Sequence, residues 1–420
     1  MTSRPAKVVL GDDAYERLAR FIGDSGDGAL LVMDRRTHAA AGERVALLLR
    51  ARELPVEECL LGGEGEPVAS EETVAAVRRR VRANRWPVAI GSGSITDIVR
   101  YAAHLETRDF LSVPTAASMD GYASSVAPLM RDGVKVTYPA RAPVAIFADP
   151  QVAAAAPLEL TRAGVGDLLA KATSRIDWLA AHLLYGEPFS PEADARVLAP
   201  LRHVAAHAEQ VMAGGEQAIR TLLHGLLESG LAMAHVGSSR PASGCEHHAS
   251  HFWDLLADRG RRAHHRHGLQ VGYATRLAMQ VQRFAFGGGV HELQVPVAPV
   301  DPLGPQARAW LGRPTPDIVE AVMQKQQFVE ARRDRWPSGR NAWRSVCERL
   351  APALGVFERV ELALDAAGIP RRPEELDLDE ATVRATFRHA TRLRGRYTTV
   401  DFLEGQARLE DALGALVPAG

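Results

Sequence analysis

Several features that would mark a specialised class of protein are scarce or absent in this sequence. The chain has 420 residues but only three cysteines, Cys59, Cys245 and Cys347. Three widely spaced cysteines do not form a disulfide framework, and they suit a reducing compartment. Lysine is also scarce and the formal net charge is −1, so the basic excess typical of nucleic-acid-binding proteins is missing. We therefore expect a cytoplasmic protein without a nucleic-acid partner.

Long apolar runs are missing as well. No stretch approaches the roughly 18 uninterrupted apolar residues of a membrane-spanning helix. The start, Met1 to Pro5, leads into a polar segment rather than the apolar core of a secretory signal. The composition that remains, with 46% hydrophobic and 24% charged residues, is that of a globular protein long enough for two domains.

Short apolar runs alternate with amphipathic stretches over the first 150 residues. The expected strands are Val8–Leu10, Gly28–Met33, Glu58–Leu61 and Trp86–Ile90; the expected helices are Asp12–Ile22, Thr37–Arg52 and one that Ser70 caps and that runs to Asn84. Alternating strands and helices predict a parallel sheet with right-handed crossovers. Residues 1–155 are therefore predicted to form an α/β domain.

Helical periodicity replaces the strand pattern after Asp149. The expected helices are Thr161–Leu184, Asp194–Gly214, Glu216–Met233, Val271–Phe284 and Pro316–Phe328, and the Gly- and Pro-rich residues 285–313 are expected to be a connecting loop. Residues 156–420 are thus predicted to form an all-helical domain. Ligand sites favour interdomain clefts and the carboxyl ends of parallel strands, so we expect the active site in the cleft between the domains.

A glycine-rich segment, Gly91-Ser92-Gly93-Ser94, follows an expected strand and begins an expected helix. Glycines let the backbone approach a phosphate, and the N–H groups of a first helical turn bind anions. The third glycine of the usual dinucleotide fingerprint is missing, so a tight turn without a ligand is the alternative.

A carboxylate also follows the expected strand Gly28–Met33. Asp34 at this position suits the ribose diol of NAD. The neighbouring Arg35 and Arg36 would instead suit the 2′-phosphate of NADP, and a turn aspartate without a ligand is a third interpretation. The pattern favours NAD.

Six of the fifteen histidines lie in one short stretch: His247, His248, His251, His264, His265 and His267. On a helix, His247 and His251 project from one face because they are four residues apart. Two imidazoles and one carboxylate leave open positions on a divalent metal, which can then polarise a substrate oxygen. Histidines gathered by chance on a surface or in a core are the alternative.

Seven stretches match one family in order: GSGSITDIVRYAA (91–103), SVPTAASMDGYASSVAPL (112–129), FADP (147–150), AGVGDLLAKATSRIDW (163–178), GSSRPASGCEHHASHFWDLL (237–256), HGLQVGYAT (267–275) and HATRLRGRYTTVDFL (389–403). Together they resemble the archaeal and bacterial sn-glycerol-1-phosphate dehydrogenases. This family is a branch of the iron-containing alcohol dehydrogenase and dehydroquinate synthase superfamily. The combination of SVPTAASMDGYASS with SSRPASGxEH is the most specific part of the resemblance.

The resemblance implies a Rossmann-like N-terminal domain, a helical C-terminal domain and a metal in the cleft. It also implies reduction of dihydroxyacetone phosphate to sn-glycerol 1-phosphate with NADH or NADPH, in a homodimer or larger oligomer. The metal is zinc in archaeal members, and nickel or iron occurs among relatives.

Site residues follow from the resemblance motif by motif. Asp167 of GVGD, His247 of SGxEH and His267 of HGxQVG match the metal ligands. His251 matches a proton relay, and Asp120 an aspartate that lines the substrate site. The pyrophosphate turn matches Gly91, Gly93, Ser94 and Asp97, and the nicotinamide-side loop matches Thr115, Ser118 and Ser124.

The sequence departs from the family at some positions. Leu269 stands where many relatives have glutamate, and His248 where many have an apolar residue. Lys171 and Arg240 are candidates for binding a substrate phosphate, although both would also suit the surface. The alternatives are a polyol dehydrogenase, a lyase like dehydroquinate synthase, whose branch has glutamate in place of Asp167, and a metal-binding protein without catalysis.

Overall fold

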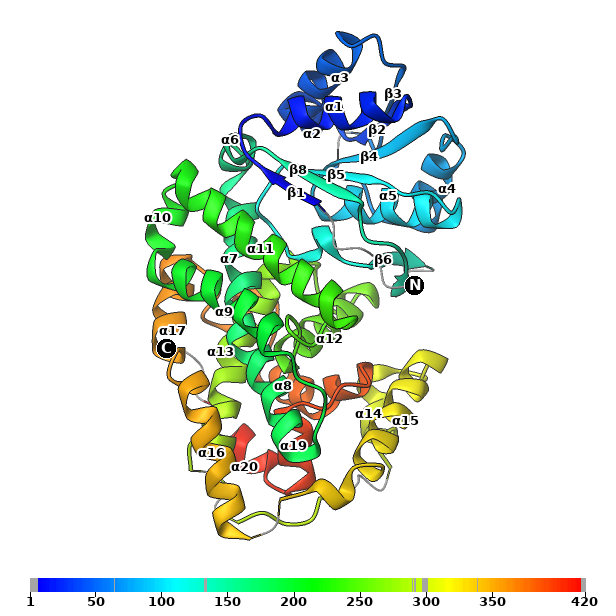
Figure 1. Ribbon diagram of the computed structural model, residues 1–420. Helices are drawn as coiled ribbons and strands as arrows, with labels where there is room; N and C mark the ends of the chain where they lie inside the picture. The colour runs from blue at the N-terminus through cyan, green and yellow to red at the C-terminus, as the bar shows by residue number, and fades with distance from the viewer. Residues whose placement is uncertain are drawn as a thin grey trace. The chain divides into compact units, whose positions relative to one another are not determined.

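The computed structural model describes residues 7–63, 65–131, 134–288, 290, 292–296, 301–337 and 339–416. Residues 1–5, on which the prediction about a secretory signal depends, lie outside this part. The chain divides into two compact units (Figure 1). The first unit is Met1–Leu168 with His207–Ser238, and the second is Leu169–Ala206 with Ser239–Gly420.

The first unit contains a six-stranded sheet in which all neighbouring strands are parallel. The strands lie in the order β1 (Lys7–Leu10), β8 (Ala145–Ala148), β5 (Leu111–Pro114), β4 (Arg85–Gly91), β2 (Gly28–Met33) and β3 (Val56–Leu60). Every residue of β2 is buried, as expected for a parallel strand covered on both faces. The predicted parallel sheet is confirmed.

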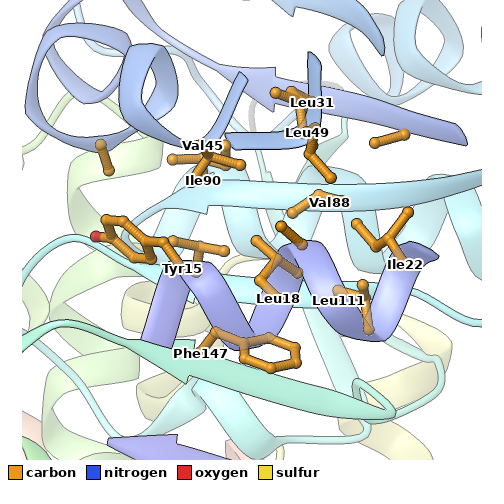
Figure 2. Close-up of a cluster of buried hydrophobic side chains, with 14 of the residues drawn as sticks. Tyr15, Leu18, Ile22, Leu31, Val45, Leu49, Val88, Ile90, Leu111 and Phe147 are labelled. Carbon is orange, nitrogen blue, oxygen red and sulfur yellow. The ribbon is translucent and has the colours of Figure 1, made fainter. Parts of the chain in front are cut away.

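Helices cover both faces of this sheet. On one face, α1 (Ala14–Ser25) and α3 (Glu43–Arg50) bury apolar side chains against the strands; Figure 2 shows Leu18, Ile22 and Leu49 packed beside Val88 and Phe147. On the other face lie α4 (Glu71–Arg78) and α5 (Gly93–Leu105). Burying one such aliphatic side chain stabilises the fold by about 1.5–3 kcal/mol.

Some predicted elements differ in extent. The helix expected over Thr37–Arg52 is α2 (Arg35–Thr37), the π-helical segment η1 (His38–Gly42) and α3. Ser70 caps α4 as predicted, but α4 ends at Arg78 rather than Asn84. The sequence pattern did not predict β5, β8 or the antiparallel pair β6 (Val126–Arg131) and β7 (Val134–Pro139).

Four helices complete the first unit: α6 (Pro150–Ala154), α7 (Leu158–Leu169), α10 (Ala208–Met212) and α11 (Glu216–Val236). Helix α11 packs on α6 and on the 3-10 turn η2 (Gly121–Ala123). This packing groups 207–238 with the sheet, so the observed units differ from a single division at residue 155. The GVGD motif, expected at the start of a helix, instead lies in the second half of α7.

The second unit is helical throughout its described residues. Its helices are α8 (Lys171–Tyr185), α9 (Pro191–Ala206), α12 (Cys245–Asp258), α13 (His267–Phe286), α14 (Pro305–Leu311), α15 (Pro316–Glu330), α16 (Arg340–Leu354), α17 (Phe357–Ala366), α18 (Glu380–His389), α19 (Thr399–Gly405) and α20 (Leu409–Gly414). The predicted loop over 285–313 is wrong in part because it contains α14, and the helix predicted over Thr161–Leu184 is interrupted at Ala170. Within the described ranges, none of the helices combines the length and apolarity needed to cross a membrane.

Candidate active site

The order of the strands places a topological switch point between β2 and β4. Strand β3 follows β2 in the chain and pairs with one of its edges, whereas β4 pairs with the other edge. Ligands bind outside the carboxyl ends of strands at such a point. Asp34 directly follows β2 and Gly91 ends β4, so two segments predicted to bind the cofactor flank this position.

Helix α5 begins directly after β4, as the glycine-rich segment predicts. Its N-cap, Ser92, makes no side-chain hydrogen bond to the first turn, which suits a helix start that binds a phosphate. The glycines also have packing reasons, since a Cβ at Gly91 would lie 2.5 Å from Ile95 Cδ1 and one at Gly93 would lie 3.2 Å from Met119 Sδ. Ser94 is exposed in the same turn.

Asp34 caps the short helix α2. Its Oδ1 accepts hydrogen bonds from the Thr37 N–H at 2.7 Å and from Thr37 Oγ1 at 3.0 Å. A structural role for this aspartate is therefore observed, and its contact with a ribose stays a prediction. Arg36 is exposed and lies 3.7 Å from Glu66.

The loop after β5 contains the residues predicted to lie beside the nicotinamide. The Thr115 N–H donates to the Gly91 carbonyl at 3.3 Å, which joins this loop to the glycine turn. Ser118 Oγ lies 3.2 Å from the Tyr122 hydroxyl, and Ser124 Oγ accepts from the Val126 N–H at 3.1 Å. Thr115, Ser118 and Ser124 are all buried.

Asp97 forms a buried ion pair with Arg100, one turn later on α5. The Arg100 guanidinium also donates to the carbonyls of Gly121, at 2.6 Å, and Tyr122, at 3.1 Å. Arg100 thus connects α5 to the loop that holds the predicted nicotinamide-side residues. Sequence reasoning missed Arg100; the signal was a charged residue three positions after Asp97 on an otherwise apolar helix face.

Two predicted site aspartates lie together in the first unit. The backbone N–H of Asp120 donates to Asp167 Oδ2 at 2.9 Å, and Ser229 Oγ donates to Asp120 Oδ2 at 3.0 Å. Asp167 is buried near the end of α7. The structure therefore joins a predicted metal ligand to the residue predicted to line the substrate site.

Three of the clustered histidines lie together in the second unit. His247 and His251 are on α12, which confirms that the pair shares a helix, and His267 is the first residue of α13. The ring of His267 lies 5.3 Å from that of His247 and 5.8 Å from that of His251, measured between centroids. Ring nitrogens of His247 and His267 approach within 4.8 Å, which is a separation that one metal ion can bridge.

Hydrogen bonds at Nδ1 orient both rings. His247 Nδ1 lies 2.8 Å from Glu246 Oε1, and His267 Nδ1 lies 3.2 Å from Ser250 Oγ. Partners of this kind orient metal-binding histidines and direct Nε2 to the ion. Neither Glu246 nor Ser250 was predicted as a site residue, although both lie within the quoted histidine motif.

Glu246 is fully buried and well supplied with donors. Its Oε1 accepts from the Gly244 N–H at 2.6 Å and its Oε2 from Thr173 Oγ1 at 2.8 Å. Burial raises the pKa of Glu246, but the hydrogen bond and charge of His247, followed by the Gly244 N–H, outweigh it and hold the pKa below its usual value. Glu246 is therefore ionised at neutral pH beside His247.

His251 has an acidic neighbour of its own. Its Nδ1 lies 4.0 Å from Asp254 Oδ2, and the Gln270 amide donates to Asp254 Oδ1 at 2.7 Å. His251 is also less buried than His247, as a group that exchanges protons with solvent should be. Of the other three histidines of the stretch, His265 lies beside Asp377 at 2.9 Å and His264 beside Asp258 at 3.4 Å, whereas His248 is buried.

Comparison with known proteins shows which family the chain resembles. The family described as iron-containing alcohol dehydrogenase matches residues 9–157. A glycerol-1-phosphate dehydrogenase [NAD(P)+] of Halalkalibacterium halodurans is 39% identical over 64% of this chain and 69% of its own. One of Geobacillus stearothermophilus is 31% identical over 94% of this chain and 92% of its own. A crystal structure of glycerol dehydrogenase from Schizosaccharomyces pombe covers 99% of this chain and 90% of its own with a TM-score of 0.65 at 18% identity, which supports the fold.

Proposed function

Because the chain belongs to the glycerol-1-phosphate dehydrogenase family, we propose that it is a metal-containing, NAD(P)-dependent alcohol dehydrogenase that reduces dihydroxyacetone phosphate to sn-glycerol 1-phosphate. The observation that carries this proposal is the similarity to relatives of that name over nearly the whole chain. The paired aspartates of the first unit and the three histidines of the second unit support it.

The donor set fits a divalent metal. We propose His247 and His267 as two ligands, each through Nε2, because Glu246 and Ser250 hold their Nδ1 atoms. Asp167 is proposed as the third ligand from its place in the GVGD motif. Imidazole and carboxylate donors suit zinc, which we propose as the native metal, with nickel or iron as alternatives.

The cofactor is proposed to bind at the switch point of the sheet. The first turn of α5, with Gly91, Gly93 and Ser94, would bind its pyrophosphate, and Thr115, Ser118 and Ser124 would line the nicotinamide. Asp97 contributes by holding Arg100 and hence this loop. Asp34 favours NAD over NADP, because a carboxylate repels a 2′-phosphate.

When bound, the metal supplies a Lewis acid for the substrate carbonyl and the nicotinamide supplies the hydride. The side chains of the chain do the remaining work. Asp120, fixed by Ser229, is proposed to orient the substrate, and His251, beside Asp254, is proposed to deliver a proton to the substrate oxygen. The enzyme is expected to act in the cytoplasm. It is also expected to form a homo-oligomer, and light scattering tests this oligomeric state.

The test mixes zinc-loaded protein with dihydroxyacetone phosphate and follows the oxidation of NADH and, separately, NADPH. We expect oxidation that a chelator abolishes, that produces sn-glycerol 1-phosphate, and that is far slower with unphosphorylated dihydroxyacetone. In the reverse direction, faster reduction of NAD+ or NADP+ by unphosphorylated polyols than by glycerol 1-phosphate would favour a polyol dehydrogenase. Conversion without net NADH consumption would favour a lyase.

Variants test the ligand set directly. Asp167→Asn and His247→Ala are expected to lose bound metal and activity together, since each removes a donor. His264→Ala is the matched control because His264 lies apart from the three histidines, and it should keep both. Full metal content and rate in either ligand variant would contradict the assignment.

A further inference from the structure

Several cations lie in or against the segment between α18 and α19, and three of them are paired. Arg392 pairs with Glu404, Lys325 with Asp401, and Arg240 with Glu187. The last pair matters because Arg240 was a sequence-based candidate for phosphate binding. Its guanidinium already holds the Glu187 carboxylate through two nitrogens and the Tyr397 carbonyl through a third.

Arg394 and Arg396 differ from these three cations. In the described parts of the chain, neither has a carboxylate at ion-pair distance. Arg394 donates only to the carbonyl of the adjacent Leu393, at 3.1 Å, and Arg396 donates to Ser239 Oγ and, at 3.3 Å, to the Ser243 carbonyl. Both side chains are half-buried. Two half-buried guanidinium groups therefore lie near each other in the chain without a direct ion pair among the described residues, and both remain able to bind an anionic ligand.

A buried and unsatisfied histidine lies in the same region. His248 is 1% exposed, and neither of its ring nitrogens has a hydrogen-bond partner among the described residues. It follows Gly244 by one turn of α12, and Arg396 contacts the adjacent Ser243. A buried imidazole normally has a partner, and an anion held by the arginines would provide it.

Arg396 lies close to a group that orients one of the proposed site histidines, because it donates to the Ser243 carbonyl at 3.3 Å and the next residue, Gly244, donates its N–H to Glu246, the partner of His247. Burial lowers the pKa of Arg396 to about 9, as do the charges of Arg394 and Arg240, whereas Glu246, the partner of His247, raises it. Burial also lowers the pKa of Arg394. The charges of Asp317 and then of Asp254, the neighbour of His251, raise that pKa. Through its contact with Ser243, Arg396 lies beside the start of α12, the helix that also contains His247 and His251.

We propose that Arg394, Arg396 and His248 form the subsite that binds the phosphate group of the substrate. This proposal rests on the proposed function and assigns its substrate specificity. A phosphate monoester carries close to two negative charges at neutral pH, which matches two unpaired guanidinium groups. Arginine forms strong charge-assisted hydrogen bonds to phosphate, and the imidazole N–H of His248 supplies a further donor.

The test compares Arg394→Met and Arg396→Met with the wild-type enzyme. Each variant should raise the KM for dihydroxyacetone phosphate about tenfold or more. The preference for dihydroxyacetone phosphate over unphosphorylated dihydroxyacetone, measured as the ratio of their kcat/KM values, should fall by a similar factor, since only the first makes a phosphate contact. Arg388→Met is the matched control because Arg388 pairs with Glu410 at an exposed position. Arg396→Lys, which keeps the charge, should recover part of the affinity.

Direct binding separates this inference from the proposed reaction. Isothermal titration with inorganic phosphate and with glycerol 1-phosphate should give measurable binding to the wild type and about tenfold weaker binding to each Met variant. His248→Phe should also weaken it. Melting temperatures confirm that the variants are folded; Arg394→Met is the safer variant, because its side chain makes only a local hydrogen bond.

The outcomes are distinct. Normal turnover by wild type with unchanged KM in the variants would overturn the subsite and leave the proposed reaction intact. Phosphate binding that the variants lose, without turnover of dihydroxyacetone phosphate, would support the subsite and reject the reaction. An equal loss of NADH or NADPH affinity would assign the arginines to a cofactor phosphate and overturn the inference. The absence of phosphate binding by the wild-type protein would also overturn the inference.

Discussion

Among single residues, Glu246 has the densest set of contacts at the proposed metal site. Its carboxylate joins His247, the Gly244 N–H and Thr173 Oγ1. It also lies in a buried cluster with Asp177 and Cys245, whose ligand atoms approach within 4.8 Å of one another. Hydrogen bonds occupy the Asp177 carboxylate, which accepts from the Cys245 N–H at 2.7 Å and from Thr399 Oγ1 at 2.5 Å. We therefore assign this cluster to positioning His247.

The substitution Glu246→Gln tests this positioning role. The amide keeps the shape of the side chain but removes the negative charge that orients and polarises the His247 ring. Loss of such a partner typically weakens metal binding about 10–100-fold. Competition with a chromogenic chelator measures the zinc affinity, and Glu209→Gln, at an exposed position, is the control. An unchanged zinc affinity in a folded Glu246→Gln protein would show that the contact is only structural.

At the scale of elements, α7 lies unusually close to the loop that follows β5. A Cβ at Gly164 would lie 1.9 Å from the Ala117 carbonyl oxygen and 3.2 Å from Leu226 Cδ1. Backbone atoms cannot move aside as a flexible side chain can, so glycine is required there. This contact fixes α7 against the segment that contains Thr115 and Ser118.

Gly164→Ala is therefore expected to destabilise the protein by about 1–3 kcal/mol through overpacking. Because the displaced loop contains Thr115 and Ser118, the affinity for NADH should also fall. Urea denaturation and NADH titration measure the two effects. Gly23→Ala in α1 is the control, since its Cβ would meet only Leu54 Cδ1 at an ordinary 3.8 Å. Equal stability of Gly164→Ala and wild type would contradict the close packing.

The same scale shows what the sequence could predict. Long periodic segments such as α11 and α13, and apolar runs such as β2, were identified because their patterns extend over many residues. The π-helical segment His38–Gly42 and the interruption at Ala170 were not, because packing decides them. The matched motifs contain Arg100, Arg394 and Arg396 as well as the histidines, but they gave these arginines no role, because that role depends on neighbours distant in the chain.

For the molecule as a whole, part of the pH dependence of stability comes from His389, a histidine that is buried without its charge. Burial, and then the charges of Arg392 and Arg388, lower the pKa of His389 to about 4, while Glu410 acts in the opposite direction. Its Nδ1 has no hydrogen-bond partner among the described residues. An unfolded histidine titrates near pH 6.5, so between about pH 6.5 and pH 4 the unfolded chain binds the extra proton.

Stability should therefore be fully present above about pH 6.5 and fall as the pH decreases toward 4, by about 2 kcal/mol from this residue after allowance for solvent screening. The glutamine of His389→Gln cannot take up this proton. The stability of that variant should therefore change less between pH 6.5 and pH 4, whatever its stability at pH 7. Urea midpoints across the range measure the slope, and exposed His203→Gln should leave it unchanged. If stability fell with pH equally steeply in His389→Gln and in the wild type, other groups would cause the acid sensitivity. His389 would then bind a proton equally well in the folded and the unfolded chain.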